Sequence, residues 1–391
     1  MEHEHYPSSI LSYINEETQT FHEKPFGFLD GFVYSLCSYF LFENSRAANS
    51  TTPFSFEKAL GSLSNEDLAD LFWFNDIAPL FREALLASPR YAPSAVSRAE
   101  AILSPQDYGQ FAACCIHVPD GSLFLSFRGT DDTITGWEEN FTMSVLETTT
   151  SQEQARAYTA RILASLADPN ADDISNNTQH RSAADAPVVR LGGHSKGGNL
   201  AFYATLTEHA ALHPYLTRAY SFDGPGFSQS FLNRFVDRSI TSRMVKITPS
   251  YSFFGSFFND TVVPRVVESN EWGLMEHMPF SWVIKNDDFV WSKQANPLTA
   301  ITDKTFARWL DVLPLEERIT FLSILFGTVE YAATSKRIVD LPMDLLKKAP
   351  LITYAYQSLD KALRKNLTKV LSALVEGFTE STQEVIKEQL R

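Results

Sequence analysis

One segment restricts the possible folds of this chain more than any other. Residues 187–192 are apolar and valine-rich, as in a buried strand, and residues 200–206 are apolar and compatible with a helix. Between them stands Gly193-His194-Ser195-Lys196-Gly197, a Gly-x-Ser-x-Gly sequence. Glycines on both sides of a serine allow a sharp turn from strand to helix, which exposes the hydroxyl at the strand end. The segment therefore predicts a strained turn that presents Ser195 as a nucleophile.

The sequence around this turn alternates short apolar strands with helices. The turn Pro119-Asp120-Gly121 separates two apolar runs and is typical of a β-hairpin. Alternation of strand and helix predicts an α/β fold with a mostly parallel central sheet flanked by helices. The expected strands are 111–118, 122–128, 187–192, 217–222 and 243–248, and the expected helices between them are 151–166, 197–209 and 228–236.

The two ends of the chain are expected to be helical. Residues 1–110 have the pattern of helices, at 28–42, 77–86 and 95–103 among others, and the chain turns helical again after Trp291. We therefore predict a domain over residues 1–290 that includes a helical N-terminal part, and a helical extension or cap over residues 291–391. The polar stretch 168–185 is expected to be a surface loop.

A nucleophilic serine needs a histidine base and a carboxylate. In an α/β fold with such a strand-turn-helix serine, the expected order along the chain is serine, then acid, then histidine. His209 and His213 lie at the far end of the helix after Ser195, about 20 Å away by helical rise. His277 is therefore the predicted base. Asp223 follows a strand and precedes Gly-Pro-Gly, which favours it as the acid, and Asp260, after the next strand, is the competing candidate.

Acyl transfer also needs two donors aimed at the oxygen on which negative charge develops. One is usually the backbone N–H after the nucleophile, here that of Lys196. The other usually comes from an earlier strand end, and Gly129-Thr130 stands at the end of the second hairpin strand.

The charge balance excludes several classes of function. The chain has 33 basic and 47 acidic residues, a net charge of −14. Such a field repels nucleic acid and anionic membrane surfaces but not a neutral ester. The longest apolar stretches, 31–42 and 319–333, are shorter than the roughly 20 residues of a membrane span. Three cysteines without a pairing pattern indicate a reducing compartment, so we expect a cytoplasmic protein. The chemistry requires no metal or cofactor.

The motifs together resemble a known group of proteins. Phe127-Arg128-Gly129-Thr130 with Trp137, and Gly193-His194-Ser195, look like the corresponding motifs of class 3 (fungal-type) lipases. Over residues 10–340 the chain more closely resembles the bacterial Mbeg-like family, uncharacterised proteins related to those lipases. The shared features are Phe26-Gly27-Phe28 with Asp30, Arg128-Gly129-Thr130, His194-Ser195-Lys196-Gly197-Gly198-Asn199, Asp223-Gly224-Pro225-Gly226, His277 with Trp282, Trp309-Leu310 and Glu317-Arg318.

This resemblance implies an α/β-hydrolase fold, a Ser/Asp/His triad and an oxyanion donor at Thr130. The chain departs from the lipases at two points. Ser250-Tyr251-Ser252 stands where those lipases carry their acid, and a charged residue, Lys196, follows the nucleophile where they have an apolar one. The resemblance implies ester chemistry without naming a substrate.

The expected function is therefore that of a serine hydrolase acting on a small-molecule ester or lipid-like substrate. Thioesterase and amidase activity would use the same residues. A different class also remains open, a non-catalytic α/β-hydrolase-fold binding or scaffold protein. Its partner surface would be the helical tail 354–391, whose apolar stripe is otherwise expected to pack within the chain. That stripe consists of Leu359, Leu363, Leu367, Leu371 and Leu374.

Overall fold

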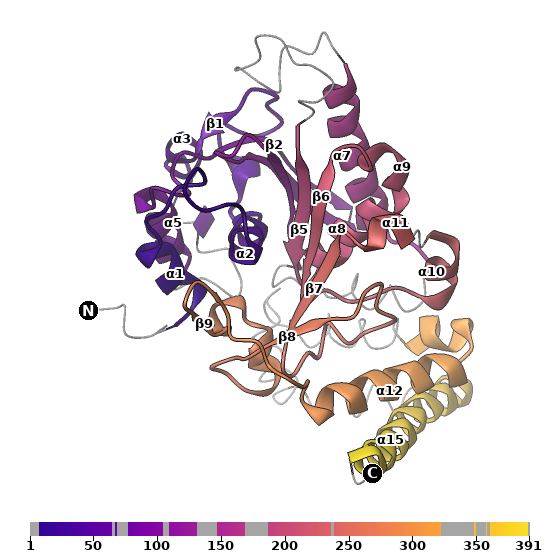
Figure 1. The fold of residues 1–391 in the computed structure, drawn as a ribbon. Helices are drawn as coiled ribbons and strands as arrows, with labels where there is room; N and C mark the ends of the chain where they lie inside the picture. The colour runs from indigo at the N-terminus through magenta and orange to yellow at the C-terminus, as the bar shows by residue number, and fades with distance from the viewer. Residues whose placement is uncertain are drawn as a thin grey trace.

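The computed structural model describes residues 8–64, 67–68, 77–104, 109–130, 147–168, 187–235, 238–321, 348, 357 and 360–389. Its centre is an eight-stranded sheet in which the spatial order of the strands follows the chain order (Figure 1). The pairs from β1 to β4 are antiparallel and those from β4 to β8 are parallel. The strands are β1 (Phe54–Ser55), β2 (Ala95–Ser104), β3 (Gly109–His117), β4 (Leu123–Phe127), β5 (Val189–His194), β6 (Leu216–Phe222), β7 (Met244–Pro249) and β8 (Arg265–Val267).

Helices cover both faces of the sheet, as the sequence predicts. One core forms around α1, α2 and α5, and the other around α7 and α8 (Figure 1). The adjacent Cys114 and Cys115 of β3 belong to these two different cores, because neighbouring residues on a strand point to opposite faces. The helices are α1 (Ile10–Glu16), α2 (Phe28–Cys37), α3 (Phe56–Leu60), α5 (Ala78–Ala87), α7 (Thr150–Ala167), α8 (Lys196–Thr207), α9 (His209–Leu212), α10 (Gln229–Phe235) and α11 (Arg238–Thr241).

The prediction of a helix over residues 95–103 is wrong. These residues form β2, which pairs with β3 along nearly its whole length. The helical pattern of this stretch is weak, because it contains small and polar residues, and pairing with the hairpin strand outweighs that local propensity. In the described residues of the N-terminal part, the helices α1, α2, α3 and α5 therefore occur together with the strands β1 and β2. The hairpin itself is confirmed, with Gly121 at φ 83° in its turn.

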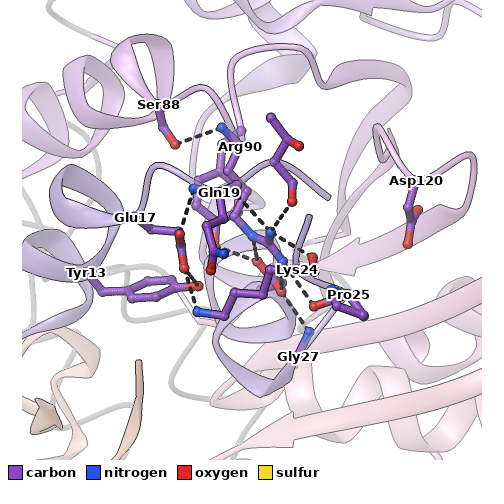
Figure 2. Close-up of polar contacts among 12 residues, drawn as sticks. Tyr13, Glu17, Gln19, Lys24, Pro25, Gly27, Ser88, Arg90 and Asp120 are labelled. Atoms are coloured by element: carbon purple, nitrogen blue, oxygen red, sulfur yellow. Dashed lines mark hydrogen bonds and ion pairs between the residues drawn. The ribbon is translucent and has the colours of Figure 1, made fainter. Parts of the chain in front are cut away.

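A buried ion pair joins the start of α2 to Arg90, which lies between α5 and β2. Figure 2 shows Arg90 beside Gln19, Lys24 and Pro25. Arg90 donates to both carboxylate oxygens of Asp30 at 2.7 Å, and both side chains are almost fully buried. The same guanidinium donates to the carbonyls of Gln19, Thr20, Lys24 and Pro25. Asp30 also accepts from the backbone N–H of Gly27 and the hydroxyl of Tyr91. Every charge in the cluster is thus partnered, which a buried ion pair requires, and the start of α2 is anchored.

The C-terminal helices form a separate layer. After β8 come the short helices η6 (Gly273–His277) and η7 (Pro279–Ser281) and the two-stranded sheet β9 (Ile284–Lys285) and β10 (Asp288–Phe289). Then α12 (Pro297–Val312) packs along α15 (Lys361–Gln389) (Figure 1). A small core between these two helices contains Trp309 and Val370. Among the described residues, no helix is long and apolar enough to span a membrane.

The expected apolar stripe of the tail packs only in part. Leu367 and Leu374 contact the core between α12 and α15, whereas Leu371 is 49% exposed. Leu359 lies outside the described residues, as do Trp137 and residues 169–185 of the expected surface loop.

Candidate active site

Ser195 occupies the sharp turn that the sequence predicts. β5 ends at His194, α8 begins at Lys196, and Ser195 between them has φ 57° and ψ −132°. A positive φ is strained for any residue with a side chain and persists only where the surrounding structure enforces it. Here the backbone N–H of Ser195 donates to the carbonyl of Phe222 at 2.8 Å, which ties the turn to the end of β6. The predicted strand, turn and helix are confirmed.

The two glycines of the motif are required by a close backbone approach. A Cβ atom on Gly193 would lie 2.6 Å from the carbonyl oxygen of Phe127, and one on Gly197 would lie 2.1 Å from it. Neither distance is possible for a real side chain, so the end of β4 reaches the turn only because both residues are glycine. The loop that follows β4 includes Thr130, a buried residue, and is thereby brought against the Ser195 turn.

Asp223 and His277 are hydrogen-bonded to each other. Asp223 directly follows β6, is fully buried, and has a positive φ of 52°. His277 ends the short helix η6, and its Nδ1 lies 2.6 Å from Oδ2 of Asp223. The ring of His277 lies 4.6 Å from that of His194, the residue before Ser195. Asp223 and His277 are thus joined to each other at the carboxyl end of β6, next to the strand that ends before Ser195.

Comparison with known proteins identifies the family of this chain. A family model described as Mbeg1-like matches residues 85–327, which include Ser195, Asp223 and His277. The chain belongs to the Mbeg1-like family. A solved structure entitled "Crystal structure of M37 lipase" is similar over 59% of this chain and 70% of that chain, at 16% identity and a TM-score of 0.30. The search of curated proteins found no match.

The two candidate acids of this Mbeg1-like chain have different partners. Asp223 contacts His277, whereas Asp260 forms an ion pair with Nζ of Lys246. The same ammonium donates to the carbonyl of Gly255 at 2.6 Å. Of the two carboxylates, the structure brings only that of Asp223 to the imidazole.

The loop that follows β7 supports this carboxylate. Ser252 donates its hydroxyl to Oδ1 of Asp223, and the ring of Phe254 lies 4.5 Å from the ring of His277. Next to His277, Glu276 accepts from the Ser250 hydroxyl and from the backbone N–H of Tyr251. No local sequence signal predicts these contacts, because they join segments about 25 residues apart.

Asn199 and Lys196, two buried polar residues of the motif, lie on α8 and make hydrogen bonds. The amide nitrogen of Asn199 donates to the carbonyls of Pro225 and Gly226, and its oxygen accepts from Gln152 of α7. Asn199 therefore holds the Gly-Pro-Gly loop that follows Asp223. Lys196 is fully buried and donates from Nζ to the carbonyl of Gln110 at 2.7 Å.

The predicted oxyanion donor Lys196 and the excluded histidines lie at opposite ends of α8. The backbone N–H of Lys196 lies at the start of that helix, where the helix dipole favours negative charge. His209 and His213 lie beyond the opposite end of the helix. Among the described residues, no group of three or more His, Cys, Asp or Glu side chains could hold a metal ion.

Proposed function

We propose that this chain is a serine hydrolase that cleaves carboxylic esters through an acyl-enzyme intermediate. The observation that carries the proposal is the 2.6 Å hydrogen bond between His277 Nδ1 and Asp223, formed beside a serine on a strained strand-to-helix turn. A carboxylate bound to Nδ1 fixes the tautomer in which Nε2 is the basic nitrogen.

The proposed reaction assigns one role to each residue. Ser195 Oγ attacks the ester carbonyl carbon while Nε2 of His277 takes the hydroxyl proton. Asp223 accepts the Nδ1–H and stabilises the imidazolium that forms. The backbone N–H groups of Thr130 and Lys196 are proposed to stabilise the oxyanion. His277 then protonates the departing alcohol, and a water molecule, activated by the same imidazole, releases the acid and restores Ser195.

The surroundings of His277 support an apolar substrate. Phe254 packs on the imidazole ring, and Phe253 and Phe257 pack on Phe254. All three rings are only partly buried, so they offer apolar surface next to the proposed base. We propose a small-molecule ester or lipid-like substrate with an apolar acyl group. Thioesters and amides are the competing substrates of the same chemistry.

The test uses a fluorophosphonate probe and a series of p-nitrophenyl esters from acetate to palmitate. Wild type should label and turn over, and Ser195→Ala should lose both, with turnover down by at least about 1,000-fold. Ser230→Ala, an exposed serine on α10, is the control and should behave as wild type. Turnover that rises with chain length would indicate a lipase, and a preference for short chains an esterase. A folded wild type that neither labels nor hydrolyses any ester, thioester or amide would overturn the proposal in favour of a binding protein.

We also propose that residues 1–290 form the hydrolase domain and residues 291–391 a helical extension. This is supported by the separate small core between α12 and α15. The family match continues to residue 327, so it includes the first residues of this extension. A cytoplasmic location is supported by the three cysteines, Cys37, Cys114 and Cys115, which are buried free thiols.

A further inference from the structure

His194, which precedes the proposed nucleophile, uses both ring nitrogens. It is fully buried, its Nε2 lies 2.9 Å from the backbone carbonyl oxygen of His277, and its Nδ1 lies 2.9 Å from the hydroxyl of Tyr39. A histidine with both nitrogens engaged cannot exchange protons with a substrate. Its contacts instead reach the backbone of the proposed base.

The protonation state of this ring follows from its partners. Burial, reinforced by the nearby His277, lowers the pKa of His194 well below its usual value, so the ring is neutral. A carbonyl oxygen only accepts, so the single ring proton is on Nε2 and donates to His277. Nδ1 is then an acceptor and receives the hydroxyl proton of Tyr39. Tyr39 therefore donates to His194, and His194 donates to the backbone carbonyl of His277.

Tyr39 and His194 also contact the loop proposed to bind the oxyanion. Tyr39 lies two residues beyond the end of α2 and is buried. A Cβ atom on Gly129 would lie 2.2 Å from the Tyr39 hydroxyl and 2.7 Å from the carbonyl oxygen of His194. Residue 129 must be glycine for the loop to sit this close, so the loop before Thr130 rests directly on Tyr39 and His194.

We propose that His194 is a positioning residue, which together with Tyr39 sets the location of His277 relative to Ser195 and to the oxyanion loop. This inference rests on the proposed hydrolase function. The Nε2–H bond fixes the backbone of His277 from one side while Asp223 fixes its ring from the other. Because the ring of His194 is neutral, it places no charge beside the imidazolium that forms on His277 at 4.6 Å. Small displacements of a base are costly, about 100-fold in rate for an error of about 1 Å.

Two amide substitutions separate this role from simple packing. The side-chain nitrogen of glutamine reaches the position of histidine Nε2, whereas the asparagine amide reaches only that of Nδ1. His194→Gln keeps the donor to His277, and His194→Asn loses it. We expect kcat on p-nitrophenyl butyrate to fall about 10- to 100-fold in His194→Asn with KM within about twofold of wild type, and to stay within about fivefold of wild type in His194→Gln.

Tyr39→Phe provides a second measurement that changes the packing little. It removes the proton donor to Nδ1 and should lower kcat about threefold to tenfold, again with little change in KM. If His194→Asn does not fold, as judged by its thermal midpoint, the Tyr39→Phe result decides, and an unchanged kcat overturns the proposal.

The outcomes distinguish this inference from the hydrolase proposal. Wild type that labels with fluorophosphonate and hydrolyses the ester, combined with equal kcat in the asparagine and glutamine variants, overturns only the role of His194. Wild type that does neither overturns the hydrolase function and this inference with it. A loss in His194→Asn that glutamine restores supports both.

Discussion

Ser252 donates its hydroxyl to Oδ1 of Asp223, the carboxylate oxygen that His277 does not contact. The segment that carries Ser252 is held by the first turn of α12. Thr299 accepts from the backbone N–H of Ser252 at 3.1 Å, and the backbone N–H of Asn296 donates to the carbonyl of Ser250 at 2.7 Å. The start of α12 therefore helps to hold the loop that contacts the carboxylate on which the proposed base depends.

Ser252→Ala should lower kcat about tenfold and leave KM nearly unchanged. A hydrogen bond to a charged group contributes about 1.5–3 kcal/mol, and its loss leaves the buried carboxylate less stable and less well oriented. Ester hydrolysis at several substrate concentrations measures both constants. Ser256→Ala is the matched control in the same loop, since Ser256 donates only to the carbonyl of Phe253. Equal kcat values for the two variants would contradict the supporting role of Ser252.

Replacing each candidate acid tests which carboxylate serves His277. Asp223→Asn should reduce kcat about 10,000-fold, because an amide can hold the imidazole in the wrong tautomer. Asp260→Asn should keep kcat within about tenfold of wild type, because Asp260 pairs with Lys246 and not with His277. A larger loss in Asp260→Asn than in Asp223→Asn would reverse the assignment. Circular dichroism of both variants checks that the fold is retained.

Arg90→Met should destabilise the protein by about 3–5 kcal/mol, because it leaves the charge of Asp30 buried without its partner. Urea denaturation followed by tryptophan fluorescence measures the free energy of unfolding. The exposed pair of Arg156 and Glu153 is the control, and Arg156→Met should change that free energy by at most about 0.5 kcal/mol. Similar losses of unfolding free energy in the two variants would show that the buried ion pair stabilises the protein no more than the exposed one.

The free energy of unfolding should fall as the pH is lowered below about 6.5. Burial, and secondarily the charge of Arg98, lowers the pKa of His117 to about 4, so the folded protein keeps this ring neutral. Between pH 6.5 and 4 the unfolded chain binds a proton that the folded chain does not, which costs at most about 1.4 kcal/mol per pH unit. Stability from this group is complete above pH 6.5 and declines as pH falls. His194 acts in the same direction.

His117→Gln checks this dependence by urea denaturation at pH 7.5, 6.0 and 5.0. Glutamine keeps a partner for the hydroxyl of Ser97, which lies 2.9 Å from Nε2 of His117. As the pH falls, the free energy of unfolding should decrease less steeply in the variant than in wild type. The difference in slope should be at most that of one proton, about 1.4 kcal/mol per pH unit. His213→Gln, at an exposed position, is the control for replacing a histidine. An unchanged pH slope in His117→Gln would exclude His117 as the titrating group.

Part of this structure could be predicted because its signals are local. The turn at Ser195 is contiguous in sequence: an apolar strand, two glycines around a serine, and an apolar helix determine it within about 20 residues. The hairpin of β3 and β4 is likewise marked by Asp120-Gly121 between two apolar runs. The local pattern failed at β2, where pairing with β3 overrides the weak preference of residues 95–103.

The contacts around the site have no such local signal. Asp223 and His277 are 54 residues apart, and Tyr39 and His194 are 155 residues apart. Sequence alone narrowed the acid to Asp223 or Asp260, because both follow strands that end at the same edge of the sheet. Only the tertiary structure decided which carboxylate contacts the imidazole, that Ser252 donates to this carboxylate, and that His194 contacts the backbone carbonyl of His277. Hydrogen bonds between distant segments depend on packing in three dimensions, which no spacing along the chain encodes.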